Sequence, residues 1–356
     1  MTKKVDFVRT VSIPRVIEVS ESARKNTRNV VENFGCSSVL ILTGKNVYEN
    51  VTQKIEARLE ELVTKTLLVG EANMREVRRI SFEIEFDEID CVVGVGGGRV
   101  LDVAKVVSTE IDVPFVSIPS TASHDGIASP IASFKEGGKP ISISTNPPAA
   151  VLADITIIRN SPIRLLRSGY GDLISNVTAV KDWVLGREKK GEEYSEVAAS
   201  MALMPAQLLL KEAEALDLKN PQHLDLLVKG LVLSGVTISI VGSSRPVSGA
   251  EHKFSHALDY LGYGRGLHGE QVALGTIIME YFHEKAYGVG DWEMIRNSLE
   301  KVRAPTTARE IGLTREQVIE ALMYAKRIRR KRYTILEDLN PSKEDFEIAI
   351  EKTGVA

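Results

Sequence analysis

The stretch Asp-Cys-Val-Val-Gly-Val-Gly-Gly-Gly-Arg-Val-Leu-Asp, from Asp90 to Asp102, shows most directly how this chain folds. Its first half is short, apolar and rich in valine, which is typical of a strand buried in a parallel sheet. Its second half runs through glycine into a helical pattern that starts at Val103. Because a strand that turns into a helix is the repeating unit of α/β folds, we expect a parallel sheet around this stretch.

The same alternation continues on both sides of the stretch. Further strands are predicted at 37–44, 65–70, 113–120 and 151–158, helices at 47–62 and 74–86, and a hairpin turning on Gly137 and Gly138. After Pro162 strand-like runs nearly vanish, and helical segments are predicted near 172–187, 193–216, 221–242, 248–261, 269–287, 291–303, 307–311, 315–329 and 342–353. The sequence therefore predicts an α/β nucleotide-binding domain with a parallel sheet at 1–160 and an all-α domain at 161–356.

Composition excludes several classes of partner. With 43% hydrophobic and 26% charged residues and a formal net charge of −3, the chain lacks the basic excess that nucleic acid or an anionic membrane requires. Its one basic block, Arg327 to Arg332, is interpreted as a solvated helix face. No signal-peptide core and no apolar run as long as a membrane span is found, so we expect a cytoplasmic protein. Cys36 and Cys91 are expected to be buried thiols in a reducing compartment and not a disulfide pair.

The glycines that follow the strand at 90–98 are a candidate phosphate cradle. Without Cβ atoms, the backbone N–H groups of Gly96, Gly97 and Gly98 can approach an anion at the start of a helix. The alternative is a tight turn that only allows close packing of that helix. Because no acidic residue closes the next strand to hold an adenosine ribose, the sequence does not separate NAD(H) from NADP(H).

A second polar loop, Ser120 to Ser129, follows the strand at 113–120. Its small hydroxyl residues, with one histidine and Asp125, suit contacts with a ribose and a nicotinamide at the carboxyl edge of the sheet. The alternative is a serine-rich turn in which Asp125 caps the next segment.

The stretch from Ser248 to Glu270 holds three of the six histidines. His252 and His256 are spaced i,i+4, so on a helix they share one face, and a glycine-rich loop lets His268 return toward them. Imidazole is a common zinc ligand, and an open catalytic zinc site needs about three protein ligands. Asp172 can complete an Asp-His-His set, although it is equally well placed as a helix N-cap. Each histidine taken alone fits a core or surface position.

Five motifs in this order carry a resemblance to a known family: Gly-Gly-Gly-Arg-Val-Leu-Asp, Ser-Thr-Ala-Ser-His-Asp-Gly-Ile-Ala-Ser, Gly-Tyr-Gly-Asp, Glu-His-Lys-Phe-Ser-His and Leu-His-Gly-Glu-Gln-Val. The chain resembles the archaeal-type sn-glycerol-1-phosphate dehydrogenases of the superfamily that includes iron-containing alcohol dehydrogenases, glycerol dehydrogenase and dehydroquinate synthase. The resemblance covers nearly the whole chain. It implies a dehydroquinate synthase-like fold and a zinc-dependent, NAD(P)H-linked reduction of dihydroxyacetone phosphate that supplies the glycerophosphate of archaeal lipids.

The resemblance also implies roles for particular residues. Asp172, His252 and His268 would bind Zn²⁺, with Asp172 also near the substrate, while Asp125 and His256 would contact the substrate and serve in catalysis, His256 as proton donor or relay. Asp102 would steady the glycine turn. The residues implied to line the NAD(P) site are Gly97, Gly98, Arg99, Val100, Leu101, Asp102, Ser120, Thr121 and Ser129.

Some relatives of this superfamily carry a fourth ligand, a histidine, where this chain has Asn176, which favours a three-ligand zinc site over iron. The alternatives are a glycerol dehydrogenase acting on the unphosphorylated alcohol, a dehydroquinate synthase-like lyase and a non-catalytic nucleotide-binding protein. Three basic residues near the histidines, Lys253, Arg245 and Arg265, are candidates for binding a substrate phosphate. The resemblance further implies a homo-oligomer.

Overall fold

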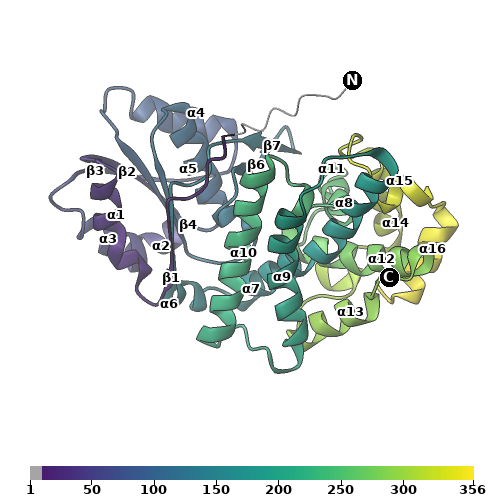
Figure 1. Ribbon diagram of the computed structural model, residues 1–356. Coiled ribbons are helices and arrows are strands. Elements are labelled where there is room, and N and C mark those ends of the chain that lie inside the picture. The colour runs from purple at the N-terminus through teal and green to yellow at the C-terminus, as the bar shows by residue number, and fades with distance from the viewer. Residues whose placement is uncertain (1–9) are drawn as a thin grey trace, which may run out of the picture.

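The computed structural model describes residues 10–356, which form a twisted parallel sheet joined to a bundle of helices (Figure 1). The main sheet contains β1 (Val16–Ser20), β2 (Ser38–Thr43), β3 (Val63–Leu68), β4 (Cys91–Gly96), β5 (Phe115–Pro119) and β8 (Ala150–Asp154). Its order is β1-β8-β5-β4-β2-β3, and all neighbouring strands are parallel. The expected α/β fold is confirmed, with the stretch at 90–102 in the middle of the sheet.

The sheet is covered by helices on both faces, as its buried strands require. These helices are α1 (Thr27–Asn33), α2 (Lys45–Val47), α3 (Gln53–Glu56), α4 (Met74–Glu83), α5 (Gly98–Glu110) and α6 (Ile155–Arg159). Alternate residues of β2 enter two different cores: Val39 and Ile41 pack with α1 and α3, whereas Leu40 and Leu42 pack with α4 and α5. Cys36 and Cys91 are buried free thiols in the first of these cores, as expected.

The hairpin β6 (Ile131–Glu136) and β7 (Lys139–Ser144) lies outside the main sheet. Its turn is formed by Gly137 and Gly138, whose φ angles are +56° and +78°. Two consecutive positive φ angles are what a two-residue hairpin turn requires, and glycine adopts them without strain. The hairpin predicted on these two glycines is therefore confirmed.

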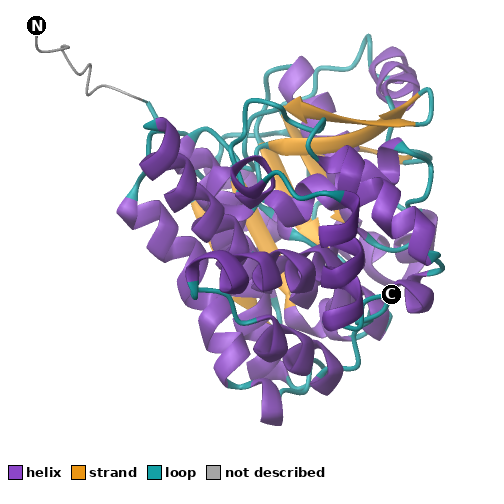
Figure 2. Cartoon of the chain, turned by 90° about the vertical axis from the view of Figure 1, so that its right-hand side faces the viewer, coloured by secondary structure: helices purple, strands orange, loops and turns teal. Residues whose placement is uncertain are grey.

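The rest of the chain is helical, as predicted, and Figure 2 shows these helices in front of the strands. They are α7 (Ile163–Ile174), α8 (Asn176–Lys190), α9 (Glu196–Lys211), α10 (Pro221–Val241), α11 (Ala250–Tyr260), α12 (His268–Tyr287), α13 (Trp292–Lys301), α14 (Arg315–Ala325), α15 (Ile335–Leu339) and α16 (Lys343–Lys352). One buried apolar cluster extends from the sheet into these helices, so the division into two domains at residue 160 stays a prediction.

Helix α10 is, within residues 10–356, the one helix long and apolar enough to span a membrane, with a mean hydropathy of 1.9 in its most apolar window. The protein itself buries 61% of that window, and the helix begins with Asn220 as N-cap and Pro221 in its first turn. A long apolar helix that is mostly covered by the rest of the protein is typical of a core helix.

Three sequence predictions are corrected by the structure. The last strand ends at Asp154 and not at Ile158, because the Asp154 side chain accepts hydrogen bonds from the N–H groups of Thr156 and Ile157 and so starts α6. Helix α14 ends at Ala325, and the basic block at 327–332 lies in turns instead of on a solvated helix face. Asp172 is not an N-cap, since it lies in the last turn of α7, which begins after Pro162.

Candidate metal and substrate site

Three helices bring one carboxylate and two imidazoles together. Asp172 comes from α7, His252 from α11, and His268 is the first residue of α12. Their possible ligand atoms all lie within 4.8 Å of one another. Asp172 Oδ1 is 3.6 Å from His252 Nε2 and 3.5 Å from His268 Nε2. The structure therefore brings together the Asp-His-His set that the sequence suggested.

Glycines allow these helices to approach so closely. A Cβ atom at Gly169 of α7 would lie 2.0 Å from the carbonyl oxygen of Ala122, and one at Gly171 would lie 2.5 Å from that of Gly269. Backbone-to-backbone contacts of this kind exclude any side chain. Helix α7 therefore packs directly on the loop after β5 and on the first turn of α12, which places Asp172 next to His268.

Neighbouring groups fix the orientation of both histidines. His252 Nδ1 donates to Glu251 Oε1 at 2.8 Å, so Nε2 is the ring nitrogen that faces Asp172. Ser255 donates its hydroxyl to Gln271 Oε1 at 2.8 Å, and its oxygen therefore accepts from His268 Nδ1, 3.3 Å away. Outer partners of this kind orient histidine ligands in metal sites.

The charge state of the set suits a cation. Burial lowers the pKa of His268 to about 3, so this imidazole is neutral. Burial also opposes charge on His252, but the nearby carboxylates of Asp172 and Glu251 outweigh it and raise the His252 pKa to about 9. His252 is therefore protonated beside the Asp172 carboxylate, and a divalent cation bound by one carboxylate and two imidazoles would replace this proton.

Asn176, the position of a fourth ligand in some relatives, does not face this set. Its buried side-chain amide donates to the carbonyl oxygen of Ala202 at 3.1 Å and to Ser234 Oγ at 2.8 Å. Because α9 and α10 already occupy this amide, Asn176 is not available as a fourth ligand, and within residues 10–356 the group that fits a metal is Asp172, His252 and His268.

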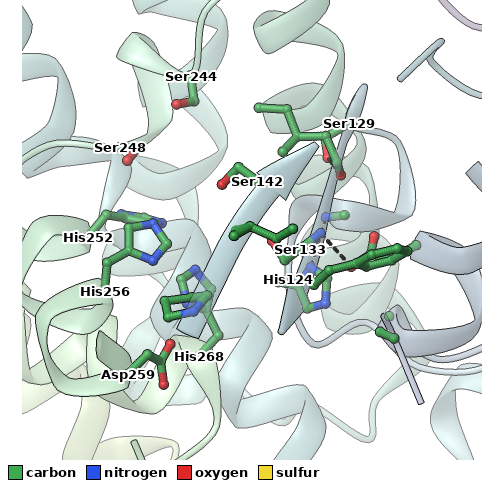
Figure 3. A pocket seen from close by; sticks show the side chains of 18 of the residues that line it. His124, Ser129, Ser133, Ser142, Ser244, Ser248, His252, His256, Asp259 and His268 are labelled. Carbon is green, nitrogen blue, oxygen red and sulfur yellow. Dashed lines mark hydrogen bonds between the residues drawn. The ribbon is translucent and has the colours of Figure 1, made fainter. Parts of the chain in front are cut away.

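The set opens into a cavity of about 730 Å³ between the sheet edge, the hairpin β6–β7 and the helices (Figure 3). This volume lies in the range of small-molecule and cofactor sites. In Figure 3, His252 and His256 lie on one side with Ser248, and His124 and Ser129 lie on the other. The cavity therefore has a metal end, defined as Asp172, His252 and His268, and an opposite end beside the glycine turn.

The residues predicted to bind the cofactor are only partly brought together. Gly98, Arg99, Asp102 and Ser129 line the cavity. Gly97, Ser120, Thr121, Val100 and Leu101 are not among its lining residues. The side chains of Val100 and Leu101 lie in the core, and their N–H groups already donate to the carbonyl oxygen of Gly97. The cofactor contacts assigned to these residues stay predictions.

Contacts within the protein itself require glycine in the turn after β4. A Cβ atom at Gly98 would lie 2.3 Å from His124 Nε2, and one at Gly96 would lie 2.7 Å from Val100 Cβ. The His124 ring is held because its Nδ1 accepts a hydrogen bond from the N–H of Gly126 at 3.0 Å. Its Nε2–H is therefore the donor that lies over the start of α5. His124 was expected only as part of the polar loop at 120–129, without a role of its own.

Asp102 connects α5 to the hairpin. Its Oδ2 accepts a hydrogen bond from the N–H of Ser133 at 3.1 Å, and its Oδ1 is paired with Lys105 Nζ at 2.9 Å. Lys105 in turn donates to the carbonyl oxygen of Ile131 at 2.7 Å. These partners tie β6 to the helix, so the expected role of Asp102 in steadying the glycine turn stays a prediction.

Asp125 and His256 both line the cavity near the metal end. The backbone N–H of Asp125 donates to Asp172 Oδ2 at 3.0 Å, which leaves Asp172 Oδ1 for the histidines. Burial and the charge of Asp172 raise the pKa of the Asp125 carboxyl to about 6. Burial and the positive charge of Arg329 lower the pKa of His256 well below its usual value, so its imidazole is neutral.

The three basic residues suggested for a substrate phosphate lie elsewhere. Lys253 is buried in an ion pair with Glu337, and Arg245 pairs with Glu192 at 2.7 Å. Arg265 is exposed and is not part of the cavity lining.

Arg329 lines the cavity instead, in the block that the sequence suggested to be solvated. The sequence also did not predict several other residues that line the cavity. They are Ser244, Ser248, the segment 71–73 and residues of the hairpin β6–β7. No spacing or motif in the sequence joins these segments.

Comparison with known proteins defines the class first. Residues 18–162 match the family model of iron-containing alcohol dehydrogenases. The structure is similar to that of a probable glycerol dehydrogenase from Sinorhizobium meliloti, with a TM-score of 0.79 and 20% identity over 97% of this chain and 98% of that one. A sulfoacetaldehyde reductase from Bifidobacterium kashiwanohense, in complex with NAD+, gives a TM-score of 0.76 at 17% identity over 97% and 98%. The fold is thus that of the iron-containing alcohol dehydrogenase class.

Sequence relatives are more specific. The chain is 60% identical to the glycerol-1-phosphate dehydrogenase (NAD(P)+) of Archaeoglobus fulgidus, over 98% of this chain and 99% of the relative. It is 45% identical to the protein of the same name from Thermococcus sibiricus, over 99% of both chains. The chain therefore belongs to the family of NAD(P)-dependent glycerol-1-phosphate dehydrogenases and is an oxidoreductase, which sets aside the lyase and the non-catalytic alternatives.

Proposed function

We propose that this enzyme is zinc-dependent and reversibly reduces dihydroxyacetone phosphate to sn-glycerol 1-phosphate with NADH or NADPH. The observation that supports it most is the buried set of Asp172, His252 and His268, oriented by outer partners and open to a cavity of about 730 Å³. One carboxylate and two imidazoles are a donor set typical of catalytic zinc sites, which keep a position open for water or substrate.

Asp172 Oδ1 and the two Nε2 atoms would hold the zinc ion, and the glycine turn with the Ser120 to Ser129 loop would hold the cofactor. When bound, zinc would polarise the ketone carbonyl as a Lewis acid and the nicotinamide would supply the hydride. The residues of this chain then have two tasks, which are to orient the ketone and to manage the proton that the new hydroxyl needs.

Asp125 and His256 are the candidates for these tasks, since both line the cavity beside the metal end. A neutral imidazole relays a proton by accepting it on one ring nitrogen and releasing it from the other. We assign this relay to His256 and assign substrate contact to Asp125. The relay predicts that His256→Ala lowers kcat and alters its pH profile, and an unchanged kcat across pH would contradict it.

The product would supply the glycerophosphate backbone of archaeal membrane lipids, and the reaction would take place in the cytoplasm. The 60% identity to an archaeal relative of that enzymatic name supports this role. The homo-oligomer implied by the resemblance also stays a prediction.

The proposed function is tested by following NADH and NADPH oxidation with dihydroxyacetone phosphate and, in parallel, with dihydroxyacetone. We expect turnover of the phosphorylated ketone and a much lower kcat/KM for the other. The product should not be oxidised by a dehydrogenase specific for sn-glycerol 3-phosphate. Equal kcat/KM values for both ketones would favour a glycerol dehydrogenase.

A further inference from the structure

A phosphorylated substrate requires a cation close to the reacting carbon, and this inference therefore rests on the proposed function. In dihydroxyacetone phosphate the phosphoester carbon is bonded directly to the carbonyl carbon. The group that binds the phosphate must consequently line the same cavity as His252 and His268. Lys253, Arg245 and Arg265 do not line it.

Within the part of the chain that the structure describes, the basic residues that line the cavity are Arg99, Lys135 and Arg329, apart from the histidines. Arg99 lies in the first turn of α5 beside the glycine turn, and its charge acts on Glu76. Lys135 lies on the hairpin, and its charge acts on Asp259. Both are exposed, whereas Arg329 is partly buried and its charge acts on the histidines.

Arg329 shares two serines with a second guanidinium. Arg329 Nη1 donates to Ser244 Oγ at 3.1 Å and to Ser248 Oγ at 3.0 Å. Arg332 Nη2 donates to Ser244 Oγ at 2.9 Å, and Arg332 Nη1 donates to the carbonyl oxygen of Ser248. The four residues Ser244, Ser248, Arg329 and Arg332 are called the arginine end of the cavity.

Two positive charges at the arginine end lack an ion-pair partner. For residues 10–356, neither guanidinium has a carboxylate oxygen within 4.0 Å, and the charges of Glu251 and Asp125 act on Arg329 only from a longer distance. Burial lowers the pKa of both arginines, and the neighbouring charge of Arg329 lowers that of Arg332 further. Partly buried like charges are costly unless an anion compensates them.

The backbone also indicates a built site. Arg329 has a φ of +45°, one of four positive φ values at non-glycine residues in the described chain. Such a conformation is disfavoured for a residue with a Cβ atom, and it persists where the surrounding contacts compensate for it. The turn separates Arg329, which lines the cavity, from its neighbour Arg330, which is exposed.

We propose that Arg329, supported by Arg332, Ser244 and Ser248, binds the phosphate group of the substrate. A guanidinium presents two parallel N–H groups that match two phosphate oxygens, and two nearby hydroxyls add further hydrogen bonds. Figure 3 shows Ser248 on the same side of the cavity as His252 and His256, with Ser244 beyond it. The arginine end is thus adjacent to the metal end, as the short distance between phosphate and carbonyl in the substrate requires.

The test compares Arg329→Gln and Arg329→Lys with Arg330→Ala, the exposed neighbour, as control. Loss of a hydrogen-bonded charge at phosphate should raise the KM for dihydroxyacetone phosphate at least about tenfold in Arg329→Gln, with a smaller rise in Arg329→Lys. Inorganic phosphate should compete with the substrate in the wild type, and its Ki should rise in parallel in Arg329→Gln. The KM for NADPH and the zinc content should stay unchanged, and Arg330→Ala should behave as wild type.

Several outcomes would overturn the inference. A KM and a phosphate Ki within twofold of wild type in Arg329→Gln would do so, as would a phosphate effect found in Lys135→Ala instead. If Arg329→Gln does not fold, inhibition of the wild-type enzyme by inorganic phosphate still tests the inference. Inhibition that is absent, or that is noncompetitive with dihydroxyacetone phosphate, would contradict a phosphate site in this cavity. Failure of the wild type to reduce dihydroxyacetone phosphate would instead reject the proposed function and is seen before any variant is measured.

Discussion

The metal end and the arginine end, two neighbouring parts of the cavity, present opposite chemistry. At the metal end, one carboxylate and two imidazole lone pairs converge from three helices, and each histidine is oriented by a further hydrogen bond. At the arginine end, the guanidinium groups of Arg329 and Arg332 extend from the turns at 326–332 and donate hydrogen bonds to the hydroxyl groups of Ser244 and Ser248. The metal end offers oxygen and nitrogen lone pairs to a cation, whereas the arginine end offers N–H donors to an anion. The cavity therefore fits a ligand in which an oxygen that binds a cation lies next to an anionic group.

The difference lies in how firmly each end is held. The side chains at the metal end lie on helices and are held by further hydrogen bonds, so they are rigid. A small displacement of one of them would disrupt the geometry that a metal ion needs. The arginine end depends on long side chains in a turn, which adjust more easily to a bound anion. Substitutions at the metal end should therefore affect turnover and metal binding, whereas those at the arginine end should affect substrate affinity.

The largest effect is expected for Asp172→Asn. The amide still accepts the hydrogen bond from the Asp125 N–H but removes the negative ligand, so kcat should fall by about 10³-fold or more, in line with the several kcal/mol that a Lewis acid supplies. Steady-state kinetics and metal analysis on the same sample check this. Asp225→Asn, at a surface pair with Lys229, is the control. Full activity of Asp172→Asn without metal would remove the basis of the metal end.

A smaller effect is expected for Glu251→Gln. The neutral amide is a weaker acceptor for His252 Nδ1–H, so zinc affinity should fall by about 10- to 100-fold while excess zinc restores turnover. Zinc titration against a competing chelator measures it. Glu196→Gln, at an exposed ion pair with Arg187, should bind zinc as the wild type does. A loss of kcat that zinc does not rescue would mean that Glu251 has another role.

The glycine turn, at the side of the cavity opposite the metal end, is probed by Gly98→Ala. The new Cβ would meet His124 Nε2 at 2.3 Å, so the ring must turn away from the start of α5. We expect the KM for NADH to rise about tenfold, since overpacking of this kind commonly costs 1–3 kcal/mol, while zinc content stays the same. In the control Gly44→Ala, the Cβ makes only an ordinary contact with Val100 at 3.4 Å. An unchanged KM would show that the cofactor does not approach Gly98.

The smallest effects should come from a matched pair of serines, one at each end. Ser255→Ala removes the acceptor of His268 Nδ1–H, and Ser248→Ala removes one of the two acceptors of Arg329. Each loss should cost about two- to tenfold, because a neutral hydrogen bond contributes about 0.5–1.5 kcal/mol. Ser255→Ala should weaken zinc binding and Ser248→Ala should raise the KM for dihydroxyacetone phosphate. If both serines changed the same parameter, the two ends would not be separate sites.

Much of the fold was predictable because its signals are local. Val92 and Val93 belong to an apolar run that ends in glycine, and Pro162 marks the change to helices. Errors arose where a single side chain decides a boundary: Asp154 turns a predicted strand into helix α6 through its N-cap hydrogen bonds. The edge strand β1 was missed, since none of its five residues is fully buried and its pairing with β8 is long-range.

The candidate site was predictable to the extent that its residues are chemically distinctive. Histidines at i,i+4 and a nearby glycine-rich loop indicated His252 and His268, although the local pattern also suggested an N-cap role for Asp172 that the structure excludes. The position of Arg329 in the cavity was not predictable. Its basic block has the pattern of a solvated helix face, and the turn with a positive φ that directs the residue inward leaves no signal in the sequence. Its serine partners lie more than 80 positions away in the sequence.

The most direct test of the account is to crystallise the zinc-loaded enzyme and record anomalous scattering on both sides of the zinc absorption edge. The account predicts a single strong peak among Asp172 Oδ1, His252 Nε2 and His268 Nε2. Protein stripped of metal should lose this peak together with NADH oxidation, and added zinc should restore both. A peak elsewhere in the cavity, or full turnover by metal-free protein, would contradict the central claim that these three residues hold a catalytic cation.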